Sequence, residues 1–180
     1  HHLSDLREAS VGHLIELCDD DPAHSVQVAA LSLQLAESLG PRLGLDPADY
    51  ELLEAGAKLA NVGLFISHSG HHKHSYYVIR NSEHLMGFTD REIELIAQVA
   101  RYHRKGRPAE KHAEFAALSE VDRARVRSMV CVLRVAIGMD RNHDGAVERL
   151  DIDDDGDHVR IELVGAPGAD LSLEAYTATE

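Results

Sequence analysis

Histidine, arginine and lysine side chains are concentrated in the middle of the chain. Residues 64–112 contain eight Lys and Arg against five Asp and Glu, a formal charge of +3, whereas the whole chain carries −13. Seven of the 13 histidines fall in the same segment. Clustered cations attract anions locally even on a molecule whose total charge repels them. The composition of this segment therefore predicts an anion-binding site.

The end of one expected helix carries side chains suited to phosphate. This helix begins at a capping box, Thr89–Glu92, and is followed by Arg101, His103, Arg104 and Lys105. An Arg guanidinium offers a planar fork to phosphate oxygens, and a Lys ammonium offers a mobile point charge. The structural alternative is that cations here compensate the helix dipole, which is worth roughly 0.3–1 kcal/mol each.

Four histidines, His68, His71, His72 and His74, come shortly before that helix. On a helix, pairs of them three or four residues apart can meet, but the four cannot share one face. Imidazoles bind transition metals readily, and buried imidazoles also commonly satisfy backbone groups. Both interpretations stay open on the sequence alone.

An acidic stretch near the C-terminus matches the calcium-loop pattern of EF-hands. Asp151, Asp153, Asp155, Gly156 and Glu162 stand at the required spacing. Such a loop needs a helix on either side, whereas the flanking apolar residues alternate with period two, which is typical of strands. Because Asp155-Gly156 is also a hairpin-turn dipeptide, the stretch is interpreted as a charged β-hairpin.

Helical periodicity dominates residues 3–143, where apolar residues repeat at three and four. Start signals stand at Asp21-Pro22, Asp46-Pro47 and Ser119, and Gly40 predicts the end of the second helix. After Asn142 the period changes to two in three short runs. We therefore expect a mainly α fold, a helical bundle over residues 3–143, with a small three-stranded antiparallel sheet over residues 144–176 packed on it in one compact unit.

Composition sets limits on location and partners. Hydrophobic residues make up 44% of the chain, which is enough for a packed core. No apolar run approaches the roughly 20 residues of a membrane span, and the acidic charge argues against nucleic-acid binding. Cys18 and Cys131 are too few for a disulfide framework, which predicts a reduced cytoplasmic protein. His1 and His2 are typical of the remnant of an expression tag.

Two strings carry a family resemblance. Residues 67–82, SHSGHHKHSYYVIRNS, and residues 101–105, RYHRK, resemble the C-terminal region of Ppx/GppA exopolyphosphatases and guanosine pentaphosphate phosphohydrolases. The resemblance extends more loosely from about Leu6 to Leu173. It implies a helical domain related to the HD superfamily, which follows two actin-like domains that hold the phosphohydrolase site. Those domains do not fit in 180 residues, so we expect either a segment expressed from a longer protein or a free-standing relative.

The same resemblance bears on metal binding. An HD site uses a first His, an adjacent His-Asp pair and a distant Asp, and these positions correspond to His24, Ala60, Asn61 and Ile137, with Asp140 one turn beyond. Alanine and isoleucine have no donor atom and an amide carries no charge. No catalytic residue, metal or cofactor is therefore expected in this domain, although the parent family is Mg-dependent. Weak candidates for metal binding are His24, His68 and His72.

By resemblance, the domain is expected to bind and position polyphosphate or a guanosine pentaphosphate-like polyanion, with homodimerisation as a further role. The residues expected to contact the anion are His71, His74, Arg80, Arg101, His103, Arg104 and Lys105. One alternative is an autonomous metal-dependent HD-type phosphohydrolase whose rearranged site uses His24, His68, His71, His74 and Asp140. Another is a helical scaffold in which these side chains only pack and cap.

Overall fold

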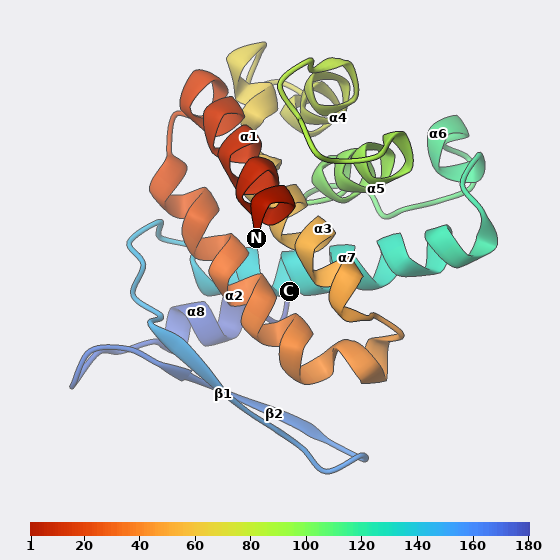
Figure 1. The fold of residues 1–180 in the computed structure, drawn as a ribbon. Helices are drawn as coiled ribbons and strands as arrows, with labels where there is room; N and C mark the ends of the chain where they lie inside the picture. The colour runs from red at the N-terminus through yellow and green to blue at the C-terminus, as the bar shows by residue number, and fades with distance from the viewer.

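The computed structural model describes all residues, 1–180, and is mainly α-helical, as the sequence predicts. Figure 1 shows helices through the first three quarters of the chain and a β-hairpin along the lower edge of the molecule. None of the helices combines the length and the apolar character that crossing a membrane requires. The helices are α1 (His2–Cys18), α2 (Pro22–Leu43), α3 (Pro47–Leu59), the 3-10 turn η1 (Val62–Phe65), α4 (His71–Asn81), α5 (Asp90–Arg101), α6 (Ala113–Ala116), α7 (Glu120–Met139) and α8 (Ser172–Thr177).

The helix starts follow the predicted capping signals. The Asp21 carboxylate accepts the backbone N–H of His24 at 3.3 Å, and Pro22 fills the first position of α2. Reciprocal capping boxes open α3 and α5. The side chain of Ser119 caps α7 by accepting the N–H of Asp122.

The end of α2 differs from the prediction. Gly40 does not stop the helix, which continues to Leu43 and ends at Gly44, whose φ of +70° is the left-handed cap conformation. Gly40 is buried within α2, where a Cβ atom would overlap the ring of Tyr50 from α3. This glycine therefore serves a close helix crossing.

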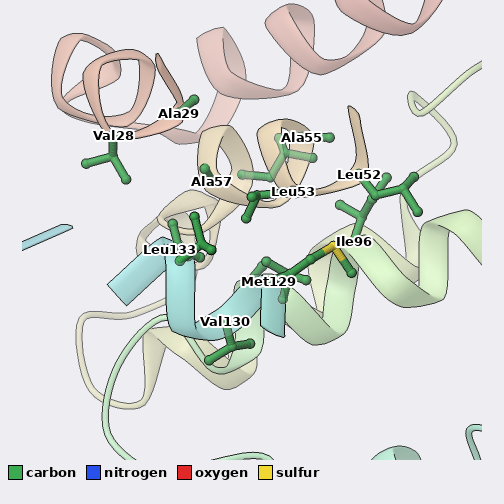
Figure 2. Packing of buried hydrophobic residues seen from close by; sticks show 14 of the residues in the cluster. Val28, Ala29, Leu52, Leu53, Ala55, Ala57, Ile96, Met129, Val130 and Leu133 are labelled. Carbon is green, nitrogen blue, oxygen red and sulfur yellow. The ribbon is translucent and has the colours of Figure 1, made fainter. Parts of the chain in front are cut away.

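The core lies between α2, α3, α5 and α7. It contains 33 buried hydrophobic residues in one cluster. Figure 2 shows Leu53 of α3, Ile96 of α5, and Met129 and Leu133 of α7 meeting in this core. This packing fixes the end of α3, the end of α5 and the end of α7 relative to the start of α2, which is where the candidate site lies.

The predicted hairpin is confirmed. Strand β1 (Arg149–Asp154) pairs antiparallel with β2 (Val159–Val164), and Ile152 lies opposite Ile161. Leu150 is buried, and its N–H donates to the Gln34 side chain of α2 at 2.9 Å. Gly156 in the turn has a φ of +93°, so the Asp-Gly turn signal is confirmed as well.

The third predicted strand is not formed, and the sheet consists of β1 and β2 alone. Leu171 is the N-cap of α8, and Leu173 lies in its first turn; this helix packs against α7. There Gly138 leaves no room for a Cβ, and its carbonyl oxygen accepts the hydroxyl of Thr177. Two leucines two residues apart are too short a pattern to distinguish a strand from the first turn of a helix.

Candidate anion-binding cleft

One cleft of about 540 Å³ lies between five parts of the chain. Its walls are the start of α2, the end of α3, η1 with the start of α4, the loop after α5, and the end of α7 with the following loop. The four positions that the resemblance matches to metal ligands all line this cleft: His24, Ala60, Asn61 and Ile137. Residues distant in sequence thus share one cavity.

The cleft also gathers residues of the basic middle segment, namely His68, His71, His103, Arg104 and Lys105. His71 is the first residue of α4, and His103 follows the end of α5, 32 residues later. Their Nε2 atoms lie 3.1 Å apart, and both side chains are buried. The contact between α4 and α5 therefore positions the cationic loop that follows α5.

Hydrogen-bond geometry assigns the tautomers of this histidine pair. The Nδ1 of His103 lies 2.6 Å from the carbonyl oxygen of Ala100, so Nδ1 carries the proton and Nε2 accepts. The Nδ1 of His71 lies 3.3 Å from Arg104 Nη1 and 3.4 Å from the carbonyl oxygen of His68; because Nε2 of His71 donates to His103, Nδ1 accepts from the guanidinium when the ring is neutral. The three hydrogen bonds all donate in the same direction, from the Arg104 guanidinium through His71 and His103 to the Ala100 carbonyl oxygen.

Both histidines of this hydrogen-bonded series, His71 and His103, are neutral near pH 7. Burial lowers the pKa of His103 to about 3. Burial, and then the neighbouring Arg104 guanidinium, lower the pKa of His71. These imidazoles therefore supply hydrogen bonds and orient Arg104, and they add no positive charge to the cleft.

A second pair of imidazoles, His24 and His143, lines the cleft at the start of α2 and in the loop after α7. His24 is buried, and its Nδ1 lies 2.7 Å from Asp140 Oδ2. The other oxygen of Asp140 accepts the N–H of Gly145 at 2.9 Å. A carboxylate at Nδ1 fixes the tautomer and leaves the Nε2 of His24 unprotonated when the ring is neutral.

The ring of His143 stacks on His24. Their centroids are 3.5 Å apart and the planes differ by 6°. The Nδ1 of His143 lies 2.7 Å from Asp21 Oδ2, and this hydrogen bond lowers the pKa of the Asp21 carboxyl. The loop after α7 is thereby tied to the start of α2, and two carboxylate–imidazole pairs stack on one another.

Three cations of the cleft have no carboxylate partner. Arg104, Lys105 and Arg141 are exposed, line the cleft, and form none of the chain's ion pairs. By contrast, Arg80 and Arg101 of the same middle segment are paired with glutamates. Unpaired cations around a concave surface raise the local concentration of anions.

Arg134 of α7 holds the cationic loop in place. Its guanidinium donates to the carbonyl oxygens of Tyr102 at 3.0 Å, Lys105 at 2.6 Å and Gly106 at 2.8 Å. Carbonyls at the end of a helix lack intrahelical partners, and here a side chain from a neighbouring helix satisfies them.

Backbone strain is confined to this cleft. Lys105 at φ +60° and His143 at φ +56° are the only residues other than glycine with positive φ, and both line the cleft. Left-handed backbone costs a non-glycine residue roughly 1–2 kcal/mol, and such strain is frequent at functional sites.

The start of α4 is held close to η1 by a serine and a glycine. Ser75 Oγ donates to the carbonyl oxygen of Ala60 at 2.6 Å and accepts the N–H of Gly63 at 2.9 Å. A Cβ atom at Gly63 would overlap the backbone of His71 and Ser75. The motif containing Ser75 therefore has a structural function, which is to place His71 and His68 at the cleft.

The structure separates the predicted anion contacts into two groups. His71, His103, Arg104 and Lys105 lie together in the cleft. Arg80 pairs with Asp90 and Glu94 outside it. The remaining two, His74 and Arg101, do not line the cleft either, and Arg101 lies near the rings of Tyr76 and Tyr102 and pairs with Glu114.

The weak metal candidates are divided in the same way. His24 and His68 line the cleft, whereas His72 does not. The Nδ1 of His72 is buried without a hydrogen-bond partner, and burial lowers the pKa of this residue to about 4. The structure contains no group of three His, Cys, Asp or Glu placed to hold a metal ion.

Sequence reasoning missed Arg134, Arg141 and His143 as residues of the site. Arg141 and His143 follow α7 in a segment interpreted only as the end of a helix. Their one available signal is the run Asp140–Gly145, whose mixture of charged residues and glycine marks a loop. The role of Arg134 depends on which carbonyls α7 approaches, and the local sequence does not encode that.

The fold is thus that of a helical domain with a cationic cleft. The sequence profile described as Ppx/GppA phosphatase, domain III, matches residues 6–173. Because this match covers nearly the whole chain, the protein belongs to the Ppx/GppA phosphatase family and corresponds to its domain III.

Similar proteins are guanosine-5'-triphosphate,3'-diphosphate pyrophosphatases of three bacteria. That of Pseudoalteromonas translucida is 34% identical over 104 residues, which cover 57% of this chain and 21% of the relative. That of Vibrio vulnificus is 27% identical over 187 residues, which cover 98% of this chain and 36% of the relative. That of Aliivibrio fischeri is 30% identical over 126 residues, which cover 69% and 24%. The chain therefore spans about a third of these relatives or less.

Proposed function

We propose that this domain binds and positions a phosphate-chain polyanion, polyphosphate or a guanosine pentaphosphate-like molecule, in the cleft. The observation that carries the proposal is the cluster of three unpaired cations, Arg104, Lys105 and Arg141, around one cavity of a chain with a formal charge of −13. Unpaired cations that gather around one cavity favour an external anion there, whereas Arg107 and Lys111, which also form no ion pair, do not line it. The cleft volume falls within the range of small-molecule sites.

Two further features support an anion at this position. The guanidinium of Arg104 is oriented by His71, and the loop that carries Lys105 is held by Arg134, so the cations are preorganised. In addition, α4 begins at the cleft with Gly70 as its N-cap and without a side-chain cap. Uncapped N–H groups at a helix start favour negative charge.

The role proposed for this domain is non-catalytic, with a degenerate HD-type metal site. Fit to a divalent ion can be judged from the donors in the cleft. Ala60 and Ile137 offer no donor atom, Asn61 offers only a neutral amide, and the Nδ1 of His24 is already bonded to Asp140. Of these four positions only one imidazole nitrogen remains, and a Zn²⁺ site uses three or four protein ligands.

The names of the relatives support the class of ligand. Each is a pyrophosphatase acting on guanosine-5'-triphosphate,3'-diphosphate, a molecule with phosphates at two positions. The chain spans about a third of those relatives, so in our proposal hydrolysis belongs to the actin-like domains of a longer protein. This domain would hold part of the substrate for them.

Calorimetric titration with tripolyphosphate, at low and at moderate salt, tests the proposal. The double variant Arg104→Ala/Lys105→Ala should bind at least about tenfold more weakly than the parent, equivalent to about 1.4 kcal/mol. The matched control is Arg107→Ala/Lys111→Ala, which removes the same charge from the same segment at residues that do not line the cleft. The control should bind like the parent.

Two results would reject the proposal. One is an absence of binding at either salt concentration. The other is an equal loss in both double variants, which would show that tripolyphosphate responds to the total charge of the segment and not to the cleft. Heparin, a polyanion too bulky for a cavity of about 540 Å³, measures the nonspecific component.

A second candidate function is autonomous phosphohydrolysis, and the His24–Asp140 pair favours it. A carboxylate that orients an imidazole is the arrangement of a general base, and the Nε2 of His24 belongs to a residue lining the cleft. Chelator-sensitive turnover of a generic phosphodiester, abolished in His24→Gln, would establish this activity. Turnover that persists in His24→Gln would exclude His24 as the general base, and no turnover by the parent chain would exclude the activity.

A further inference from the structure

We propose that one apolar face of the domain pairs with the same face of a second copy of this chain, in a two-fold symmetric dimer. The face consists of exposed apolar side chains from α1, from η1 and its C-cap, from α4, and from the loop between α4 and α5. They are Leu3, Leu6, Leu17, Phe65, Ile66, Tyr77 and Met86. None of them lines the anion-binding cleft, so this inference goes beyond the proposed function and does not depend on it.

Exposed apolar surface is concentrated on this face. Eleven large hydrophobic residues of the chain are exposed, and seven of them belong to it. About half of each side chain is exposed, and a large side chain has roughly 150–250 Å² of surface, so the face presents on the order of 700 Å². Monomeric proteins rarely expose a contiguous apolar patch larger than a few hundred Å². A surface of this kind favours a partner that covers it.

One end of the face is a groove of about 540 Å³ between α1, η1 and α4. Its most exposed apolar side chains are Phe65 and Tyr77, at 71% and 61%. Glu83 is the only Asp, Glu, Lys or Arg in the lining, although the whole chain has a formal charge of −13. Because two copies of an acidic chain repel each other, a surface with few charges is where they can meet.

The other end of the face is an apolar ridge formed by Leu3, Leu6 and Met86, none of which lines the groove. The loop that carries Met86 is held against α1. Ser10 Oγ lies 3.3 Å from the Met86 carbonyl oxygen, and Arg7 Nε donates to the Gly87 carbonyl oxygen at 2.9 Å. The charge of Arg7 is compensated by two glutamates. The ridge is therefore both fixed in position and free of uncompensated charge from this arginine.

A groove and a ridge on one face make that face self-complementary. Leu3 and Leu17 stand near the two ends of α1, about 21 Å apart along the helix axis. A two-fold axis near Ser10, in the middle of α1, sets the two α1 helices antiparallel and places the ridge of each copy in the groove of its partner. Each copy then contributes roughly 700 Å² of apolar surface, close to the 800 Å² per partner of a standard interface.

Sedimentation velocity tests the inference. The parent chain should sediment as a dimer at about 100 µM, because interfaces of this size bind with micromolar affinity or tighter. Phe65→Ser/Tyr77→Ser removes the groove end and should raise the dissociation constant of the dimer at least about tenfold. The matched control, Val121→Ser/Tyr176→Ser, removes two side chains of similar exposure, 61% and 63%, from α7 and α8. It should dimerise like the parent.

A mixture of two variants tests the pairing of ridge with groove. Leu3→Ser/Met86→Ser removes the ridge end and should also weaken its own dimer, because both contacts of that dimer lose a ridge. In a mixed dimer the Phe65→Ser/Tyr77→Ser chain supplies an intact ridge, and the ridge variant supplies an intact groove. One of the two contacts is then complete. The mixture should therefore associate more tightly than either variant alone.

Three results would overturn the inference. One is a folded parent chain that stays monomeric at about 100 µM, which would leave the face to a different partner, such as the rest of a longer protein. Another is the same dissociation constant for the groove variant and its matched control. The third is a mixture that associates no better than the separate variants, since the copies then do not meet ridge in groove. Circular dichroism and urea unfolding verify that each variant is folded.

The cleft variant Arg104→Ala/Lys105→Ala separates this inference from the proposed function. It should dimerise like the parent, because the cleft and the groove have no lining residue in common. Loss of its tripolyphosphate binding with an unchanged dimer supports both proposals independently. A monomeric parent that still binds tripolyphosphate in the cleft overturns the dimer and leaves the proposed function standing.

Discussion

Replacement of Arg134 by lysine should weaken polyanion binding although Arg134 is not expected to touch the ligand. Its guanidinium bridges the carbonyl oxygens of Tyr102, Lys105 and Gly106, and so connects the end of α5 to the loop that carries the cations. Arg134→Lys keeps the charge, but an ammonium on a flexible stem cannot reproduce the planar fork that reaches three acceptors.

The magnitude follows from the balance of these bonds against strain. A hydrogen bond to a charged group contributes about 1.5–3 kcal/mol when buried, and two of these three bonds are exposed, so the bridge is worth about 2–3 kcal/mol. Holding Lys105 at φ +60° costs about 1–2 kcal/mol. When most of these hydrogen bonds are lost, their remaining free energy no longer exceeds the strain of Lys105. Relaxed conformations of the loop then become as stable as the observed one. If the observed conformation falls to about a tenth of the population, apparent affinity falls about tenfold.

The assay is calorimetric titration of Arg134→Lys with tripolyphosphate, together with urea unfolding to confirm that the variant is folded. The control is Arg127→Lys on the same helix, whose guanidinium lies 5.0 Å from the centre of the Phe115 ring and does not line the cleft. Arg127→Lys should bind within about twofold of the parent. The reasoning is refuted if folded Arg134→Lys also binds within that margin.

Three further predictions concern the surroundings of the cleft. Gly63→Ala should lower the free energy of unfolding by about 2–3 kcal/mol in urea, because its Cβ would force α4 away from η1, whereas Gly106→Ala, with open space around it, should have little effect. Burial holds the pKa of His103 near 3, against about 6.5 in the unfolded chain. Below pH 6.5 the unfolded state therefore binds more protons than the folded state. The free energy of unfolding should fall by about 2 kcal/mol between pH 7 and pH 5. Urea titrations of His103→Gln should show a smaller fall, and an unchanged slope would contradict this assignment. Arg101→Ala should retain polyanion affinity, because Arg101 is paired with Glu114 outside the cleft; a tenfold loss by calorimetry would contradict that placement.

Local signals predicted much of the fold. Capping side chains at Asp21, Asp46, Thr89 and Ser119 identified four helix starts, because these residues satisfy backbone N–H groups within their own turn. Gly40 was misleading because its role depends on Tyr50 of another helix. The third strand was misleading because a short alternation is compatible with both periods until its packing partner is known.

The candidate site was predictable where its residues are neighbours in sequence. Arg104 and Lys105 stood out in a basic segment, and the structure places both in the cleft. Arg80 looked similar in sequence, but the packing of α4 on α5 brings Glu94 within 2.8 Å of it. Arg141 gave no such signal in the sequence, and only the packing of α7 places it at the cleft. Whether a cation is free or paired is a property of tertiary structure.

The most direct test of the central claim is to locate tripolyphosphate on the domain by NMR. Backbone amide resonances would be assigned and followed during titration. The account predicts the largest shifts in two parts of the cleft, at Arg104 and Lys105 and at Arg141 to His143, with small shifts at Arg107 and Lys111. Largest shifts at Arg107 and Lys111, or shifts spread over all exposed cations, would contradict a specific site in this cleft.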